Sequence, residues 1–201
     1  MFYEPEKRDR NLLPHDPFKA IIAPRPIGWI TAMSAKGEIN LAPYSFFNAL
    51  NSRPNLVMFS SEGLKDSVAF ILETREFVCN LATYDLRDAV NATSAPLPRG
   101  VNEMEHAGLT AAPSRIVKPP RVAESPCALE CKVTDVVSMK THDGQPIDSH
   151  VVFGQVVGVH IDDRFLANGM LDTAAMRPIA RCGYHDYAVA DRMFSLIRPG
   201  A

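Results

Sequence analysis

The segment at residues 27–47 has the pattern of a β-hairpin, and it constrains the fold more than any other part of the chain. Ile27, Trp29 and Thr31 alternate with other residues at the period of two that is typical of a strand. Gly37 falls in the connecting turn, where a positive φ angle is accessible to it. The returning strand at residues 39–47 contains Pro43, so we expect this strand to lie at a sheet edge and to bend there.

The remaining chain alternates short strands with short helices. Apolar periodicity predicts strands at residues 55–61, 76–82, 127–134 and 151–161, and helices at residues 64–74, 85–94, 102–107 and 164–176. We expect Asp66 or Ser67 to cap the helix at residues 64–74. Long crossover helices between strands are missing from the pattern, which argues against a doubly wound parallel sheet. The pattern predicts a mainly β barrel with helices packed outside it.

Length and composition define the class of protein. A chain of 201 residues, 46% hydrophobic, fits one domain over residues 1–201, with residues 1–17 as an N-terminal arm. A net charge of −2 without a basic run argues against a nucleic acid or a membrane surface as partner. The charged start is not a signal peptide, and no apolar run reaches the roughly 20 residues of a membrane span. Four cysteines are too few for a disulfide framework, so we expect a cytoplasmic protein.

The segment from Ser60 to Ser67 is a candidate phosphate site. A loop with Gly63 leads from a predicted strand into a helix start that carries Lys65. Free N–H groups at a helix N-terminus favour an anion, and a lysine adds a full charge. Arg25, between two prolines, is a second candidate, because a stiffened backbone suits a two-pronged phosphate contact. A capped surface helix with a solvated lysine, and a surface arginine, remain the structural alternatives.

The hairpin also offers the wall of a ligand pocket. Small-molecule sites are mostly apolar with a few placed polar groups. Trp29, Tyr44, Phe46 and Phe47 supply the flat apolar surface. Polar groups at its rim come from Thr31, Ser34, Asn40, Ser45 and Asn48. The alternative interpretation is ordinary barrel core with turn residues.

Histidine and cysteine chemistry gives weaker signals. His150 precedes a predicted strand and follows Asp148, so it is a candidate proton donor or ligand contact; a solvated turn histidine is the alternative. Cys127 and Cys131 share a strand face with Leu129 and Val133 and alternate with Glu130, which predicts buried core thiols. We therefore expect no metal site. No Gly-x-Gly-x-x-Gly segment is present, so any nicotinamide would be handled without the usual dinucleotide fold.

These segments, taken in order, resemble the flavin reductase-like family of FMN-binding split barrels, which includes flavoredoxin and the reductase components of two-component monooxygenases. The resemblance covers roughly residues 18–190. Its motifs are Pro24-Arg-Pro-Ile-Gly-Trp-Ile-Thr, Asn40-Leu-Ala-Pro-Tyr-Ser-Phe-Phe, Lys65-Asp-Ser, Phe77-Val-Cys-Asn, Glu105-His-Ala-Gly-Leu-Thr and His150-Val-Val-Phe-Gly-Gln-Val-Val-Gly. It implies a six-stranded antiparallel split barrel with Greek-key character that works as a homodimer, with FMN near the subunit interface.

The resemblance also implies roles for individual residues. The phosphate end of FMN would contact Arg25, Lys65, Asp66 and Ser67, with Ser60 and Ser61 closing the loop. The ribityl chain and ring would contact Trp29, Thr31, Asn40, Ala42, Pro43, Tyr44, Ser45, Phe46 and Phe47. Arg181 and Tyr187 are further candidates near the cofactor. The family carries Gly-Asp-His where this chain has Asp148-Ser-His150, so the catalytic role implied for His150 rests on a broken motif.

The expected activity is hydride transfer from NAD(P)H to flavin, with the reduced flavin serving a monooxygenase or another redox protein. Flavin chemistry belongs to the cofactor, which accounts for the lack of an obvious acid–base pair in the chain. The alternatives are an FMN-holding electron carrier reduced by a protein donor, and a dimeric barrel that has lost FMN or binds another flat ligand.

Overall fold

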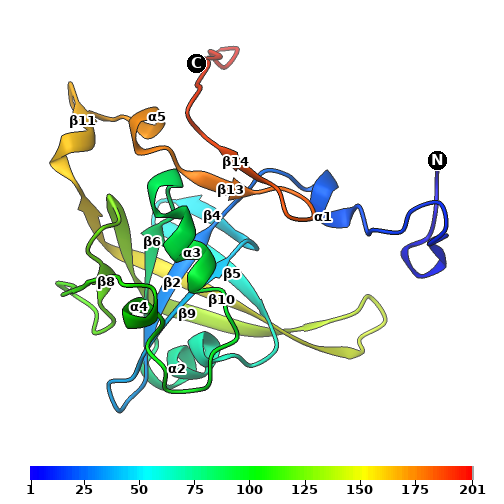
Figure 1. The fold of residues 1–201 in the computed structure, drawn as a ribbon, viewed down its shortest axis with the longest axis horizontal. Coiled ribbons are helices and arrows are strands. Elements are labelled where there is room, and N and C mark those ends of the chain that lie inside the picture. Colours follow the sequence, from blue (N-terminus) through cyan, green and yellow to red (C-terminus); the bar gives the residue numbers. More distant parts are fainter. Residues whose placement is uncertain (201) are drawn as a thin grey trace.

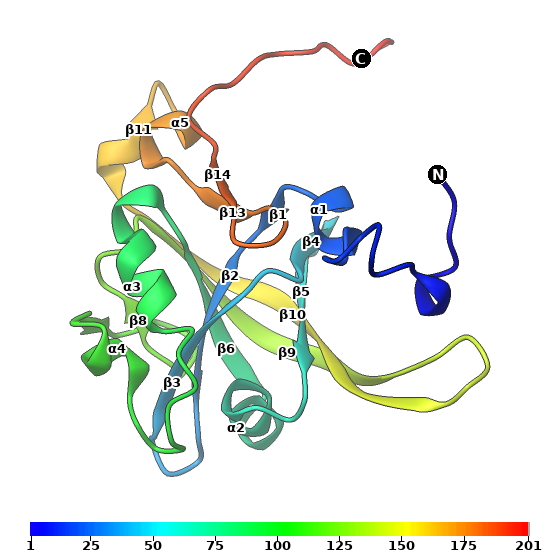
Figure 2. The ribbon, with the colours of Figure 1, turned by 45° about the vertical axis from the view of Figure 1, so that its right-hand side comes forward.

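A large antiparallel sheet organises the molecule, as seen in Figures 1 and 2 of the computed structural model, which describes residues 1–200. Its seven strands lie in the order β3 (Ile39–Tyr44), β2 (Gly28–Met33), β6 (Glu76–Leu81), β9 (Cys127–Lys140), β10 (Pro146–Ile161), β5 (Asn55–Glu62) and β4 (Phe47–Ser52). The predicted mainly β split barrel is confirmed. Six of these strands are the expected ones, and β4 adds a seventh.

Shorter elements surround this sheet. The helices are α1 (Phe18–Ile21), α2 (Asp66–Thr74), α3 (Arg87–Ala92), α4 (Glu103–His106) and α5 (Thr173–Met176), with 3₁₀ turns at Pro5–Lys7, Tyr84–Leu86 and Asp163–Phe165. A three-stranded sheet contains β1 (Arg25–Pro26), β13 (Ile179–Arg181) and β14 (Tyr187–Val189). Two small ribbons pair β7 (Ala111–Ala112) with β8 (Arg121–Val122), and β11 (Leu166–Ala167) with β12 (Met170–Leu171). Among residues 1–200, none of the helices has the length and apolar character of a membrane span.

The sheet curls until its two ends approach each other. Gly28 on β2 lies so close to Phe47 on β4 that a Cβ built on Gly28 would stand 2.6 Å from Cδ2 of Phe47. Only a glycine permits this approach, since real Cβ atoms do not come so near to a neighbouring carbon. Helix α2 packs Val68, Phe70 and Ile71 into the same interior cluster as the strands. The closed interior is therefore one hydrophobic core with α2 at its end.

Strand β2 is buried on both faces. Ile30 and Ala32 belong to the interior cluster, whereas Trp29 packs with Val90 of α3 and Met104 of α4 on the outer face. A strand covered on both sides has no solvent face. The alternating sequence pattern therefore predicted the position of this strand, but it could not indicate which face of the strand lines a pocket.

Pro43 lies in β3, which is an edge strand of the sheet, as its missing N–H requires. The bend that we predicted at Pro43 comes two residues later. Strand β3 ends at Tyr44, residues 45–46 turn, and β4 begins at Phe47, where we expected one strand over residues 39–47 with an interruption at Pro43. The turn interrupts the strand at Ser45 and Phe46, although the Phe46 carbonyl still accepts the Ser60 N–H of β5 at 2.8 Å.

The strands β9 and β10 are longer than predicted. They continue past the barrel as a ribbon that projects from the body and turns at residues 141–145 (Figure 1). Most side chains of the projecting half are exposed and many are polar, so no period of two marks them as a strand. Backbone pairing with the partner strand maintains the ribbon instead.

Two helix predictions were wrong in detail. Residues 164–176 are not one helix, because Asn168 and Gly169 take positive φ angles and close the β11–β12 ribbon before α5 begins. Helix α2 begins with Lys65 as its N-cap, without a side-chain cap, in place of the predicted Asp66 or Ser67. Both of those residues lie inside the first turn of the helix.

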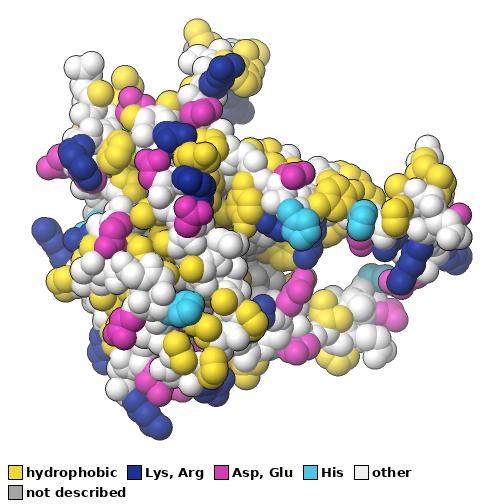
Figure 3. Space-filling view, viewed as in Figure 1, with side chains coloured by type: hydrophobic (Ala, Val, Ile, Leu, Met, Phe, Trp, Pro, Cys, Tyr) yellow, Lys and Arg dark blue, Asp and Glu magenta, His cyan; other side chains and the backbone are white. Residues whose placement is uncertain are grey.

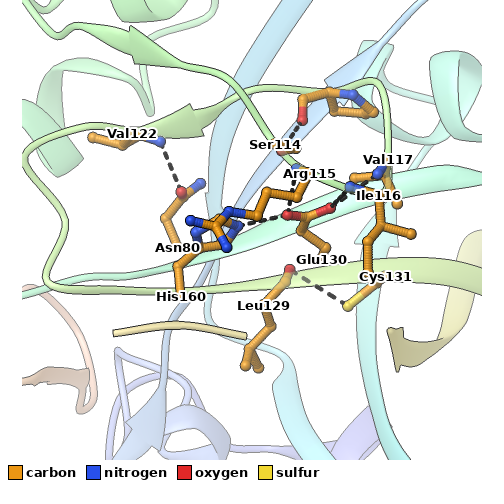
Figure 4. Close-up of polar contacts among 11 residues, drawn as sticks. Asn80, Ser114, Arg115, Ile116, Val117, Val122, Leu129, Glu130, Cys131 and His160 are labelled. Atoms are coloured by element: carbon orange, nitrogen blue, oxygen red, sulfur yellow. Dashed lines mark hydrogen bonds and ion pairs between the residues drawn. The ribbon is translucent and has the colours of Figure 1, made fainter. Parts of the chain in front are cut away.

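Glu130 on β9 is buried, although it alternates with the apolar residues of that strand. The backbone at residues 115–117 crosses this face of the sheet, and the N–H groups of Arg115, Ile116 and Val117 donate to the Glu130 carboxylate at 2.7–2.9 Å (Figure 4). His160 Nε2 on β10 lies 2.5 Å from its Oε1. Of the predicted core thiols, Cys131 is buried and Cys127 is half-buried.

Candidate functional site

A pocket of about 490 Å³ opens where β3, β5 and α2 meet, within the 300–1,000 Å³ typical of ligand sites. It is lined from β3 and the following turn by Asn40, Ala42, Pro43, Tyr44, Ser45 and Phe46, and from β5 and α2 by Ser60, Glu62, Lys65, Asp66 and Ser67. The loop after α3 contributes Thr93, Ser94, Ala95, Pro96 and Leu97, with Lys19 and Glu103 completing the lining. The two predicted segments, the hairpin wall and the helix start, thus meet in one cavity.

One end of the pocket is suited to an anion. Lys65 is the N-cap of the nine-residue helix α2, and no side chain caps the first N–H groups of that helix. Free N–H groups and the helix dipole both favour negative charge there. Among the residues that the structure describes, the Lys65 ammonium has no carboxylate partner.

A buried hydrogen-bond network fixes the floor of the pocket. The Ser67 hydroxyl donates to Oδ1 of Asn40, and Nδ2 of Asn40 donates to Oε1 of Glu103 at 2.8 Å. The other carboxylate oxygen of Glu103 accepts the Leu41 N–H at 3.0 Å. Helices α2 and α4 are therefore both tied to β3 directly beneath the lining.

Tyr44, one of the lining residues, has an unsatisfied polar atom in the barrel interior next to this pocket. Its side chain is buried, with the residue only 7% exposed, yet its hydroxyl has no hydrogen-bond partner within residues 1–200. Burial raises the pKa of Tyr44, and the neighbouring Ser67 and Ser61 hydroxyls offset this only in part. Since an unpaired buried hydroxyl is costly, the site fits a ligand that supplies the missing partner.

Phe46 forms an apolar wall beside two cations. Lys19 Nζ lies 5.5 Å and Arg25 Cζ 5.8 Å from the centre of the Phe46 ring, distances typical of cation–π contacts. Lys19 also lines the pocket, a role that the sequence did not suggest. The cavity therefore has a lysine at α2 and a second lysine next to the aromatic wall.

Arg25 does not line the pocket. Its side chain is buried, and Nη1 donates to the carbonyls of Lys19 and Ile22 while Nη2 donates to the Cys182 carbonyl at 2.7 Å. These bonds fasten helix α1 and the following Ile22 to the loop after β13. Arg25 therefore holds the backbone that presents Lys19 through its two Nη groups, and the phosphate contact that we expected of it stays a prediction.

Several other predicted residues lie outside the lining. Trp29 and Thr31 are fully buried in the core; the Trp29 indole donates to Thr93 Oγ1 at 2.9 Å, and Thr31 Oγ1 accepts from Asn80. Phe47 packs against the interior cluster, and the Ser61 hydroxyl donates to the Gly63 carbonyl. Trp29 thus acts on the pocket indirectly, through Thr93.

His150 and Arg181 also stand apart from the cavity. His150 on β10 pairs with Ser61 on β5; its Nδ1 is 3.4 Å from Ser138 Oγ, and its Nε2 is 3.7 Å from Asp148 Oδ1, too far for a hydrogen bond. Arg181 donates to the Tyr184 carbonyl and stacks on Tyr187. His150 is one strand away from the pocket-lining edge of β5.

The residues that sequence reasoning missed come from distant parts of the chain. Glu103, the loop at residues 93–97 and Lys19 have no local pattern that marks a site. The hydrogen-bond partners of Glu103 and Thr93 lie 62–64 residues away in the chain, on β3 and β2, and Lys19 meets the site through Phe46. Their only sequence signals are structural: a short helix stopped by Gly108, and a loop rich in proline. Among residues 1–200, no group of three or more His, Cys, Asp or Glu side chains could hold a metal.

Comparison with known proteins places this geometry in context. Residues 22–178 match the family described as "Flavin reductase like domain". Uncharacterised proteins of Halalkalibacterium halodurans and Aquifex aeolicus are 38% and 36% identical, over 89% and 85% of this chain and 87% and 86% of their own lengths.

Solved structures give the same result for the fold. Nitrilotriacetate monooxygenase component B from Bacillus cereus has a TM-score of 0.88 at 27% identity, and the match covers 98% of each chain. Flavoredoxin of Desulfovibrio vulgaris has a TM-score of 0.78 at 17% identity, over 89% of this chain and 93% of its own. The second match is a likeness of fold alone.

Proposed function

Because the chain belongs to the flavin reductase-like family, we propose that its pocket holds FMN and that the protein is an oxidoreductase that draws on NAD(P)H. The observation that carries this proposal is one cavity with an uncapped helix start and an unpaired Lys65 at one end, lined also by Phe46 and by Tyr44, whose buried hydroxyl has no partner in residues 1–200. A phosphate needs the first of these features, and a polar-edged flat ring needs the second.

Different residues of the chain would bind different parts of FMN. Lys65, Ser67 and the first N–H groups of α2 would hold the phosphate, with Ser60 closing that end. Asn40 and Tyr44 would bond polar atoms of the ribityl chain and ring, and Phe46 would cover apolar surface. When bound, FMN supplies hydride acceptance at N5 and onward electron transfer; the protein positions it and limits water.

We further propose that His150 contacts the nicotinamide donor and not the flavin. It lies outside the lining, but its strand β10 runs beside β5, which contributes Ser60 to the pocket. His150→Gln should then raise the KM for NAD(P)H while leaving the Kd for FMN within about twofold. An equal change in both constants would place His150 with the flavin.

The proposal also includes an electron acceptor and a cellular compartment. We propose that a separate redox protein of the monooxygenase type takes the electrons, as the name of the Bacillus cereus relative implies for that protein. The thiols of Cys79, Cys127, Cys131 and Cys182 are all unpaired, which fits the reducing cytoplasm.

The test of function has two stages. FMN is added to the purified protein, and binding is followed by quenching of flavin fluorescence; no quenching would reject the proposal and favour a barrel that has lost its cofactor. The FMN-loaded protein is then mixed with NADH or NADPH under nitrogen in a stopped-flow instrument, with dithionite as the control reductant. Bleaching by a nicotinamide supports the reductase. Bleaching by dithionite alone rejects it in favour of a carrier reduced by a protein donor.

A further inference from the structure

The charged side chains that line the pocket carry a net negative charge, which does not favour binding of an anion. The lining contains two lysines, Lys19 and Lys65, but three carboxylates, Glu62, Asp66 and Glu103. A net negative lining opposes a phosphate dianion, since like charges a few ångströms apart repel by about 1 kcal/mol in water and more in a partly buried site. Arg25 lies near Phe46, but the proposed function calls for a further cation at the end of the pocket where α2 begins.

Arg99 supplies that cation. Its Nε donates to Oδ1 of Asp66 at 2.7 Å, and the Asp66 side chain is only 23% exposed. Asp66 is the first residue of α2, so its carboxylate stands at the helix start where a phosphate would bind. Of the three lining carboxylates it is the one that would meet the phosphate most directly.

Arg99 belongs to a strap, residues 94–100, that crosses from α3 to the start of α2. Figures 1 and 2 show the connection between α3 and α4 reaching the end of the molecule where α2 lies. The strap is fixed at one end by buried Thr93, which accepts from Trp29, and beyond its other end by Glu103. Between these anchors, Arg99–Asp66 is the one ion pair that ties the strap to α2 within the described residues.

We propose that Arg99 is a positioning residue for the phosphate of the bound flavin, an inference that rests on the proposed function. It neutralises Asp66 and holds residues 94–97 against the pocket, so that the phosphate meets Lys65 and the free N–H groups of α2 without a competing carboxylate. Riboflavin, which has no phosphate, gains nothing from this neutralisation. Arg99 thus contributes to selection of the phosphorylated flavin.

The experiment measures Kd values for FMN and for riboflavin by fluorescence quenching in wild type, Arg99→Gln, Arg99→Lys, Asp66→Asn and the Asp66→Asn/Arg99→Gln double variant. Arg99→Gln should weaken FMN about tenfold and riboflavin less than twofold. Arg99→Lys should keep most of the affinity. The double variant should recover FMN binding to within about threefold of wild type, because the uncompensated carboxylate is gone. Arg164→Gln, which breaks the exposed pair with Asp162, is the matched control and should change neither Kd.

The possible outcomes distinguish a failure of the inference about Arg99 from a failure of the proposed function. If Arg99→Gln weakens both flavins equally, or if the double variant binds FMN as poorly as Arg99→Gln, the strap is purely structural and the inference is overturned. Unchanged FMN binding by Arg99→Gln, with normal binding by wild type, overturns this inference alone. A wild-type protein that binds neither flavin rejects the proposed function and this inference with it.

Discussion

Lys65 combines two properties that rarely occur together at one side chain: it lines a cavity, and it stands at an uncapped helix start without a partner carboxylate in residues 1–200. A charge-assisted hydrogen bond contributes about 1.5–3 kcal/mol, and the exposure of Lys65 favours the lower figure. The Lys65→Ala change should thus weaken FMN roughly tenfold and riboflavin much less. Quenching titrations with both flavins check this, with the exposed Lys36→Ala as control. Equal loss for both ligands would remove Lys65 from the phosphate.

Unlike Lys65, Arg25 already has hydrogen-bond partners, because its Nη1 and Nη2 groups donate to three backbone carbonyls. Arg25→Gln removes these part-buried hydrogen bonds, each worth about 0.5–1.5 kcal/mol. We expect a melting temperature lowered by several degrees and faster proteolysis of the arm at residues 1–22. The ratio of the FMN and riboflavin Kd values should stay constant. A selective loss of FMN would restore the direct phosphate contact that the sequence suggested.

Among the secondary-structure elements, those that pack on a core on one or both faces were predictable. Strands β5 and β6 and helix α3 carry clear periodicity, whereas the outer half of the β9–β10 ribbon has no core to face and left no pattern. The residues of the candidate site were likewise predictable only where a local sequence pattern marks them. Asn40 to Phe46 and Lys65 to Ser67 are contiguous and were predicted, but Glu103 and Lys19 reach the pocket only through tertiary contacts.

Glu130 joins three elements, since it connects the strands β9 and β10 to the backbone at residues 115–117. Burial raises the pKa of Glu130, but the hydrogen bonds from that backbone and from His160 outweigh it and lower the pKa to about 2. The folded pKa is below the ordinary value of 4.5, so this stabilisation is complete above pH 4.5 and is lost as the pH falls toward 2.

The Glu130→Gln variant should therefore lose about 2–3 kcal/mol of unfolding free energy at pH 6.5, and its deficit relative to wild type should shrink by about 1 kcal/mol at pH 3.5. Urea unfolding of both proteins at the two pH values measures this. Glu6→Gln in the exposed arm is the control. A deficit that is identical at both pH values would contradict an ionised Glu130 in the folded state.

For the whole molecule, two projections leave a hollow at one side of the barrel. The N-terminal arm and the β9–β10 ribbon extend from the body in Figure 1, and Figure 3 shows the open space between them. The ribbon exposes the apolar side chains Val137, Met139 and Ile147, which in water is unfavourable. Because the ribbon carries His150 at its base, anything that packs on it also packs beside the pocket.

We expect a second copy of the chain to cover this ribbon, as the resemblance to dimeric split barrels implies. Wild type should then elute with about twice the 22.1 kDa chain mass in size-exclusion chromatography with light scattering. Met139→Asp and Val137→Asp should shift the protein toward the monomer, because a buried unpaired carboxylate costs several kcal/mol at an interface. Leu166→Asp, an equally exposed apolar site on β11, should leave the mass unchanged. A monomeric wild type, or a dimer that only Leu166→Asp dissociates, would show that the ribbon is not the contact between copies.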